Sequence, residues 1–141
     1  MKKGSIITFI LFIALLTPAF SLAGEVVIIA NEHVSASTLA KDDIKQIFLG
    51  KKTIWDNGSK IVFVVQKRTE VSEWFLKTYV MKNAYQYDIY WKKRVFTGRG
   101  KAPKSFSSDQ EIVQFVSETP NAIGYVSTGT DTGKAKIITV Q

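Results

Sequence analysis

Apolar residues run almost without interruption through two short segments of the chain, Glu25–Ala30 and Ile61–Gln66. Both segments are rich in valine and isoleucine, which is typical of a strand buried on both faces of a sheet. Two later segments, Ala122–Ser127 and Ala135–Val140, predict terminal strands joined by a turn of threonine, glycine and aspartate. We therefore expect a sheet whose first two strands are central and covered on both faces.

A first helix is expected from about Lys41 to Leu49, between the first two strands. Ile44, Ile47 and Phe48 recur there at helical spacing, so they share one face. Two aspartates occupy the first turn, where the helix dipole favours acidic side chains. The segment is therefore predicted to be an amphipathic helix.

Three more helices are expected after the second strand. One begins after an N-cap at Thr69, and another covers Tyr85–Val95. The last begins with a capping box of Ser108 and Glu111 and is closed by Pro120. Glycine and proline predict a loop at 96–103. One face of the first helix carries Val71, Trp74, Phe75 and Thr78. In the second, Ile89 and Tyr90 are expected to face inward beside Trp91. In the third, the capping box precedes Ile112, Phe115 and Val116.

The order of these elements, β-α-β-α-α-α-β-β, predicts a mixed α/β fold. No change in composition and no linker separates a second unit. Residues 24–141 are therefore expected to form a single domain with one modest core.

Residues 1–23 have the parts of a secretory signal peptide. Lys2 and Lys3 are basic, residues 6–16 are almost wholly apolar, and small residues precede a cleavage point after Ala23. The apolar run is shorter than the roughly 20 residues that span a membrane. Gly24 follows, so no lipid anchor on cysteine is expected; an uncleaved anchor is the alternative. We expect a periplasmic or secreted protein.

The chain is basic, with a formal charge of +7 that falls to +5 once Lys2 and Lys3 are removed. In a cytoplasmic protein this charge would indicate nucleic acid as a partner. Export argues against nucleic acid. A soluble anion, an anionic surface or an acidic protein is the better interpretation.

The chain has no cysteine and only one histidine, His33. Disulfides and thiolate chemistry are therefore excluded. No other histidine lies at metal-ligand spacing, so His33 is interpreted as a polar loop residue, and we expect no metal and no cofactor. Nothing places an imidazole base beside a nucleophile, so an enzyme is the least supported class.

The segment Ile47–Trp55, followed by Asp56-Asn57-Gly58, combines a helix end, a glycine stop at Gly50, a basic turn and a tryptophan. It resembles the "IF.G...W..G" segment of the substrate-binding proteins of phosphate ABC transporters. Residues 120–126, Pro-Asn-Ala-Ile-Gly-Tyr-Val, are similar to "PGAIGYV" of that family. Tyr90-Trp91 with 96–100 resembles its short, single-lobe members. The resemblance implies one periplasmic-binding-protein-like lobe, a mixed β-sheet flanked by helices.

The resemblance also implies an anion site at Arg68, Thr69 and Ser72. In the family an arginine precedes "..GSGT", and the helix N-terminus there holds the oxyanion. Arg68 and Ser72 match the arginine and the serine. Valine, glutamate and tryptophan replace the two glycines and the threonine, and they restrict the approach of backbone to an oxyanion. The alternative is a capped helix in which Arg68 pairs with Glu70 or Glu73.

A second candidate anion site lies in the basic loop, at Arg94, Arg99 and Lys101. The glycines there would present backbone N–H groups, and an arginine fork suits phosphate or carboxylate. The alternative is a solvated helix end, because basic residues near a helix C-terminus need no ligand to explain them.

Two functions follow. The first is an exported, non-catalytic solute-binding-like module that binds phosphate or a similar oxyanion in transport or sensing. The alternative is a protein-interaction module of the cell envelope with a degraded ligand site, docking on a transporter or sensor. The family's full-length members close two lobes around the ligand. A single lobe leaves the ligand in solvent, so a homo-oligomer or a docked envelope partner would supply the missing wall.

Overall fold

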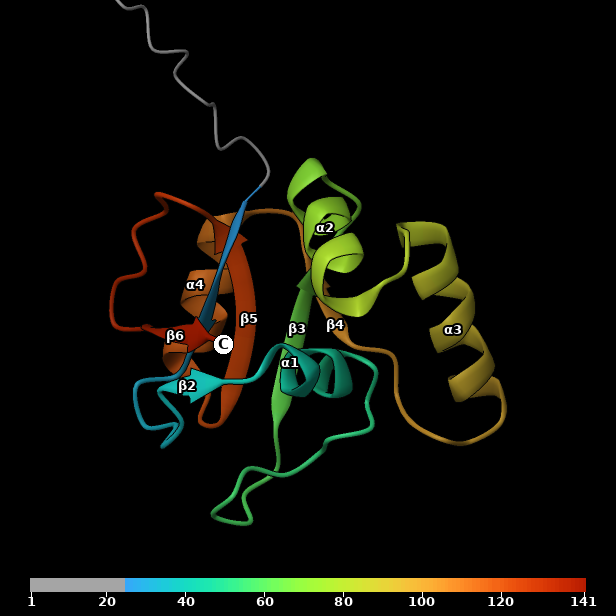
Figure 1. Ribbon diagram of the computed structural model, residues 1–141, viewed down its shortest axis with the longest axis horizontal. Coiled ribbons are helices and arrows are strands. Elements are labelled where there is room, and N and C mark those ends of the chain that lie inside the picture. Colours follow the sequence, from blue (N-terminus) through green and yellow to red (C-terminus); the bar gives the residue numbers. More distant parts are fainter. Residues whose placement is uncertain (1–24) are drawn as a thin grey trace, which may run out of the picture.

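The computed structural model describes residues 25–141, and the predicted signal peptide lies outside them. Within this range six strands form one sheet in the order β2-β6-β1-β5-β3-β4 (Figure 1). The sheet is mixed: β1 is antiparallel to β5 and β6, whereas β3 is parallel to β4 and β5. The strands are β1 Val26–Ala30, β2 Thr38–Leu39, β3 Val62–Gln66, β4 Lys104–Phe106, β5 Ala122–Ser127 and β6 Lys136–Val140.

The four strands predicted from apolar runs are all present, and β1 and β3 are interior strands as expected. The sequence missed β2 and β4. These strands have two and three residues, which is too short for any alternation to be recognised.

Helices cover both faces of the sheet (Figure 1). The helices are α1 Lys41–Phe48, α2 Glu70–Phe75, the π-helix η1 Leu76–Val80, α3 Ala84–Phe96 and α4 Asp109–Glu118. One buried apolar cluster joins the sheet to α1, α2, η1 and α3, and a second joins it to α4. No helix within residues 25–141 is long and apolar enough to cross a membrane. The α/β class and its sheet flanked by helices are therefore confirmed.

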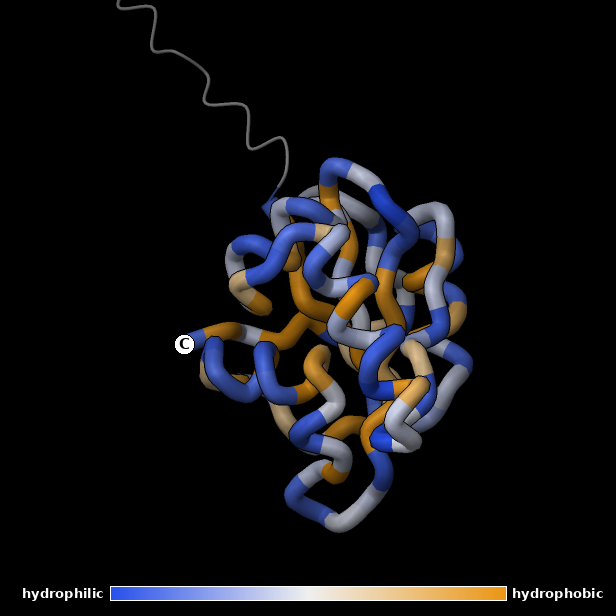
Figure 2. The backbone as a smooth tube through the Cα atoms, turned by 90° about the vertical axis from the view of Figure 1, so that its right-hand side faces the viewer, coloured by the Kyte–Doolittle hydropathy of each residue, from blue (hydrophilic) through white to orange (hydrophobic). Residues whose placement is uncertain are grey.

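Alternation along the strands divides the core between these two clusters. In β1, Ile28 belongs to the cluster under α1, and its neighbour Ile29 belongs to the cluster under α4. Figure 2 shows the hydrophobic stretches gathered in the middle of the molecule, with hydrophilic segments around them. Gly124 of β5 packs directly against α4 and β3, because a Cβ there would be 3.0 Å from Ile112 of α4 and 3.1 Å from Val64 of β3.

The inner face of α3 differs from the prediction. Tyr87, Trp91 and Arg94 face the rest of the molecule at spacings of four and three residues, together with Tyr90. Ile89 lies on the opposite side of the helical wheel, so it points outward and is 46% exposed. The prediction that Ile89 faces inward was wrong.

Caps were predicted for α2 and α4; the first is confirmed, and the second is only half present. Thr69 caps α2 as expected, because its hydroxyl accepts a hydrogen bond from the amide of Ser72. Ser108 accepts from the amide of Glu111, but the Glu111 carboxylate accepts from the amide of Ser107 and not from that of Ser108. The reciprocal capping box predicted at the start of α4 is therefore only half present.

Candidate functional site

A cavity of about 650 Å³ lies beside the carboxyl end of β3, where α3 stands away from β4. Residues from β3, α2, η1, α3, β5 and the 102–105 segment line it. Its apolar wall includes Val65, Leu76, Ala84, Tyr87, Trp91 and Tyr125. Its polar side chains are Gln66, Lys67, Arg68, Ser72, Asp88, Lys92 and Ser105.

Arg68 lies on the short segment that connects β3 to α2. It is exposed, and it lines both this cavity and a shallower hollow that also includes Thr69, Glu70 and Glu73. The ion pairs found within residues 25–141 join His33 to Glu32 and Lys52 to Asp43. Arg68 takes part in neither, so the pairing with a glutamate that the alternative required is not found. Its guanidinium remains available to a ligand.

Thr69 and Ser72 form a reciprocal cap at the start of α2. The amide of Ser72 donates to Oγ1 of Thr69 at 3.1 Å, and the amide of Thr69 donates to Oγ of Ser72 at 2.9 Å. Oγ of Ser72 also donates to the carbonyl of Thr69, and Oγ1 of Thr69 donates to Gln66. Both hydroxyls therefore have protein partners, and their evident role is to fix the backbone beside Arg68.

A buried glutamine anchors the end of β3, and sequence reasoning missed it. Nε2 of the Gln66 side chain donates to Oδ1 of Asp109, and the backbone amide of Gln66 donates to the hydroxyl of Tyr125 at 3.1 Å. Tyr125 itself stacks on Phe75 with ring centres 3.8 Å apart. The strand end that precedes Arg68 is thus held by α4, β5 and α2 together. The only available signal was a polar residue at the end of an apolar run.

Asp109 receives several hydrogen bonds in this network. Partial burial alone would raise its pKa, but bonds from Ser127, Gln66 and Thr130 outweigh burial, and the pKa of Asp109 is lowered from its usual 3.8. The carboxylate therefore stays ionised at neutral pH. It bridges α4, the end of β3 and the segment after β5.

The inner face of α3 is tied to the end of α1 by three side chains. The hydroxyls of Tyr87 and Tyr90 donate to the carbonyls of Phe48 and Leu49, at 2.7 and 2.6 Å. Arg94 donates to the carbonyl of Gly50 at 3.3 Å. These bonds satisfy carbonyl groups that a helix C-terminus leaves open. Burial raises the pKa of Tyr87, so this donor keeps its proton across the accessible pH range.

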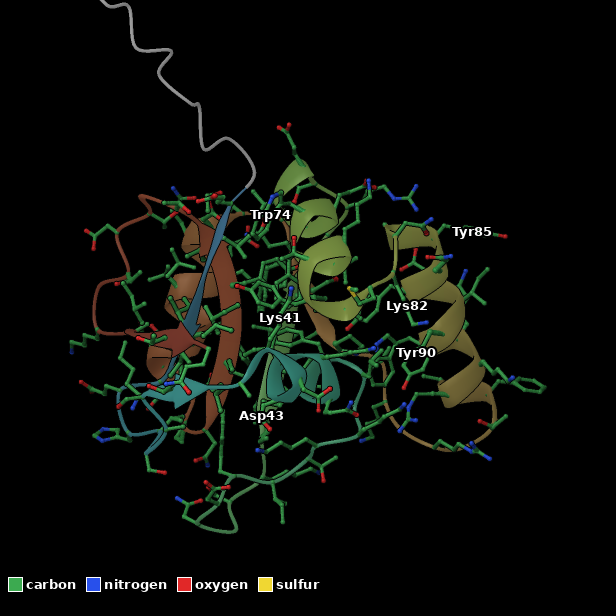
Figure 3. All side chains as sticks on the ribbon, viewed as in Figure 1. Lys41, Asp43, Trp74, Lys82, Tyr85 and Tyr90 are labelled. Carbon is green, nitrogen blue, oxygen red and sulfur yellow. The ribbon has the colours of Figure 1, made fainter. Side chains whose placement is uncertain are left out.

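Figure 3 shows how α3 presents different side chains on its two sides. Tyr90 and Lys82 lie on the side toward α1, where the ammonium of Lys82 is 5.5 Å from the centre of the tyrosine ring. Tyr85 points away from the rest of the protein and is 66% exposed. Ile89 and Phe96 are also exposed, at 46% and 93%.

The basic loop predicted as a second site is not brought to Arg68. Arg94 packs over the rings of Tyr90 and Trp91, and it also donates to the carbonyl of Arg99 at 3.2 Å. Arg94, Arg99 and Lys101 are not among the described residues that line the cavity. Lys92, from the same basic stretch of sequence, does line it.

The charged side chains at the cavity are mostly positive. Lys67, Arg68 and Lys92 carry three positive charges, against one negative charge on Asp88, and all four side chains are exposed. Such a cluster attracts anions from solution, and the arginine adds planar, bidentate hydrogen bonding to an oxyanion. The arrangement can bind and orient an anion.

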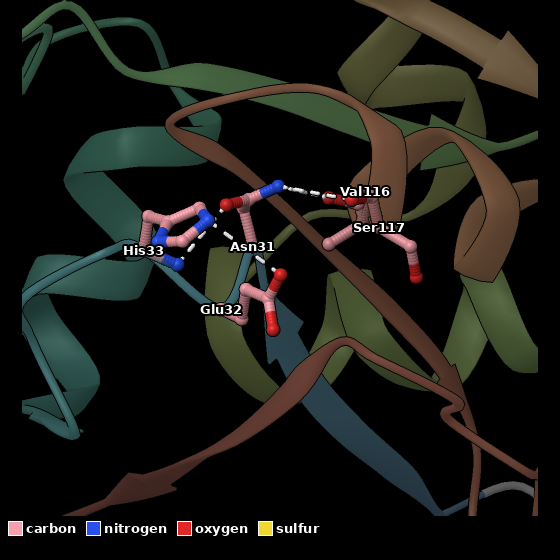
Figure 4. Close-up of polar contacts among 5 residues, drawn as sticks. All are labelled: Asn31, Glu32, His33, Val116 and Ser117. Atoms are coloured by element: carbon pink, nitrogen blue, oxygen red, sulfur yellow. Dashed lines mark hydrogen bonds and ion pairs between the residues drawn. The ribbon is translucent and has the colours of Figure 1, made fainter.

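His33 follows β1 and is not among the described residues that line this cavity; Figure 4 shows its surroundings. Asn31 donates to the carbonyls of Val116 and Ser117, at 3.0 and 3.2 Å, and its Oδ1 accepts from the amide of His33. The imidazole lies 3.5 Å from Glu32 and is 80% exposed. In the described part of the chain, no group of three or more histidine, aspartate and glutamate side chains could hold a metal ion.

No protein-family model matches the chain. No curated protein matches it in sequence. Solved structures do. A protein of Clostridium perfringens, described as a phosphate ABC transporter substrate-binding protein and solved with bound phosphate, superposes with a TM-score of 0.62 at 20% identity, covering 82% of this chain and 44% of its own.

Two further structures agree with the first. An ABC-type phosphate transport receptor of Vibrio cholerae gives a TM-score of 0.56 at 16% identity, over 82% of this chain and 45% of its own. PstS of Borrelia burgdorferi gives 0.55 at 16% identity, over 82% and 47%. The chain thus spans less than half of the length of each of these three structures. Residues 25–141 have the fold of one part of the substrate-binding proteins of phosphate ABC transporters, and the likeness predicted from the sequence is confirmed at the level of the fold.

Proposed function

We propose that this protein is a non-catalytic module that binds phosphate, or the phosphoryl group of a larger molecule, at the cavity beside Arg68. The observation that carries the proposal is an exposed arginine that has no ion pair within residues 25–141. It lies at the mouth of a cavity, after a strand end held by buried and partly buried hydrogen bonds. Lys67 and Lys92 reinforce the positive charge there. The phosphate-binding descriptions of the structural neighbours support the same ligand class.

The proposed setting is the periplasm or the exterior of the cell, with the signal peptide at 1–23 removed and residues 24–141 forming a single domain. The basic charge and the predicted export support this setting. The module would deliver its anion to a transporter or report it to a sensor. An open site in water holds a charged ligand weakly, so we expect an affinity in the millimolar to high micromolar range.

Isothermal titration of the purified protein with inorganic phosphate tests this proposal. We expect saturable heat from the wild-type protein and none from Arg68→Glu, because the reversed charge repels the anion. Lys134→Glu is the matched control, since Lys134 is exposed on the segment before β6 and lines neither hollow. The absence of heat at millimolar phosphate would contradict phosphate as the ligand, and so would equal loss in both variants.

The exposed side of α3 favours a second function, docking on an envelope protein. Tyr85 and Ile89 are one helical turn apart and exposed, and Phe96 is 93% exposed on the same helix. Lys92 and Lys93 separate Phe96 from the other two side chains. The candidate contact is therefore the exposed pair Tyr85 and Ile89, because exposed apolar groups on a surface helix favour a contact with another protein. The double variant Tyr85→Glu, Ile89→Glu should abolish co-purification of an envelope partner and leave the phosphate titration unchanged. An unchanged partner yield would argue against docking through α3.

A further inference from the structure

The cavity beside Arg68 is much larger than inorganic phosphate. Phosphate has five heavy atoms, which occupy roughly 150 Å³ if each takes the ~30 Å³ of a water molecule in the liquid. The cavity has about 650 Å³. Pockets of a few hundred cubic ångströms and more hold small organic molecules. A phosphate ion at Arg68 would therefore leave most of this space to water.

The wall away from the charged mouth is apolar. Val65 of β3 and Trp91 of α3 are 7% and 6% exposed, and Tyr125 of β5 is fully buried. The apolar side chains of the lining that water reaches most are Val95 and Phe96 of α3, at 46% and 93%. Leu76 and Ala84 add further apolar surface from η1 and α3. Water in contact with such a wall is released at a gain in free energy when an apolar group replaces it.

Gln66 and Ser72, two polar side chains of this wall, are already hydrogen-bonded within the protein, whereas Nε1 of Trp91 is buried with no hydrogen-bond partner among the described residues. Gln66 bonds to Asp109 and to Tyr125, and Ser72 bonds to Thr69 in both directions. They do not demand a polar ligand in the interior. The charges that remain available, on Lys67, Arg68 and Lys92, are exposed side chains. The cavity thus combines a cationic mouth with an apolar interior.

We propose that the ligand of this cavity is an organic phosphate monoester with an aromatic or aliphatic body. The phosphoryl head lies at Lys67, Arg68 and Lys92, and the body lies over Trp91 and Val65. This inference rests on the proposed function, because it uses the same cationic mouth. It adds that the apolar body supplies a large share of the affinity and that inorganic phosphate is only a fragment of the true ligand.

Titration calorimetry with three probes tests the inference: 1-naphthyl phosphate, inorganic phosphate and 1-naphthol. We expect 1-naphthyl phosphate to bind at least tenfold more tightly than either of the other two, because it alone uses both parts of the cavity. Equal affinities for the ester and inorganic phosphate would overturn the inference and leave the proposed function standing. If neither phosphate compound bound, both would fall. Equal affinities for the ester and 1-naphthol would also overturn the inference, since the head would then contribute nothing.

A cavity-filling variant locates the binding of the body. Ala102 is exposed and lines the cavity, so Ala102→Trp places an indole there without entering the core. We expect this variant to lose at least fivefold in affinity for 1-naphthyl phosphate and less than twofold for inorganic phosphate. Gln114→Trp, on the exposed side of α4, is the matched control and should change neither affinity. Circular dichroism verifies that both variants fold. Equal losses in the two variants would overturn the assignment of the body to this cavity.

Discussion

Arg68 and Arg94, two arginines that the sequence predicts as anion ligands, differ in burial and in hydrogen bonding. Arg94 is half-buried, donates to the carbonyls of Gly50 and Arg99, and packs over two aromatic rings. Arg68 is exposed, and within residues 25–141 it has no ion pair, although it lies on a segment whose neighbours are firmly bonded. The fold uses Arg94 to join α3 to the end of α1. Arg68 contributes nothing comparable to the fold.

This difference separates structural basic residues from those available to a ligand. A cation that already satisfies carbonyl groups has lost much of its capacity to bind an anion, because both uses need the same N–H donors. Positive charge in the sequence is therefore a poor guide to a site. The bonding of each cation in the structure is a better one, and it favours Arg68 over Arg94.

The largest expected effect on stability is at the contact between α3 and the end of α1, which Arg94 helps to hold. Gly50 has φ of +70°, and a Cβ there would lie 2.6 Å from the indole of Trp91. Gly50→Ala should lower the free energy of unfolding by about 3 kcal/mol, through overpacking added to backbone strain. Gly129→Ala is the control, because Gly129 has φ of +87° with no atom near its Cβ and should lose about 1 kcal/mol. Urea unfolding measures both. Equal losses would contradict close contact between α3 and the end of α1.

Alanine substitutions of the two arginines test the comparison itself. Arg94→Ala should lower the free energy of unfolding by about 1–2 kcal/mol, through lost hydrogen bonds and ring contacts, and leave phosphate binding intact. Arg68→Ala should change stability by less than about 0.5 kcal/mol and reduce phosphate affinity about tenfold. Urea unfolding and calorimetry on both variants give the four values. Loss of phosphate binding in Arg94→Ala alone would reverse the assignment.

The sequence predicts the parts of this molecule that depend on patterns within one segment. Apolar runs revealed β1 and β3, and the Gly50 segment correctly placed a helix end. The cavity joins residues far apart in the sequence, such as Val65, Trp91 and Tyr125, and nothing local indicates that α3 stands away from β4. The bond between Gln66 and Asp109 spans 43 positions. Ile89 was placed inward because apolar character alone does not distinguish a core residue from an exposed one.

Asp109 offers a smaller, pH-dependent test of the network behind Arg68. Its lowered pKa means that the ionised carboxylate stabilises the fold above pH 3.8 and that this contribution is lost as the pH falls through the native pKa. Asp109→Asn should cost about 1 kcal/mol at pH 7. The difference from wild type should shrink below pH 3.8. Urea unfolding from pH 3 to 7 measures it. Asp56→Asn, at an exposed position outside this network, is the control and should show a small, flat difference.

The smallest expected effect concerns the acidic side chains near Arg68. Glu73 lines the shallow hollow that Arg68 shares, so its charge opposes an anion bound there. Glu73→Gln should raise phosphate affinity about twofold at low ionic strength, and the gain should vanish in 1 M salt, where charges are screened beyond about 3 Å. Glu118→Gln, at the exposed end of α4, should have no effect. Calorimetry at two salt concentrations provides the measurement. A gain that persisted in 1 M salt would mean that Glu73 acts by shape or hydrogen bonding and not by its charge. The difference between Arg68, which has no ion pair within residues 25–141, and Arg94, which bonds to carbonyl groups, would then not be electrostatic.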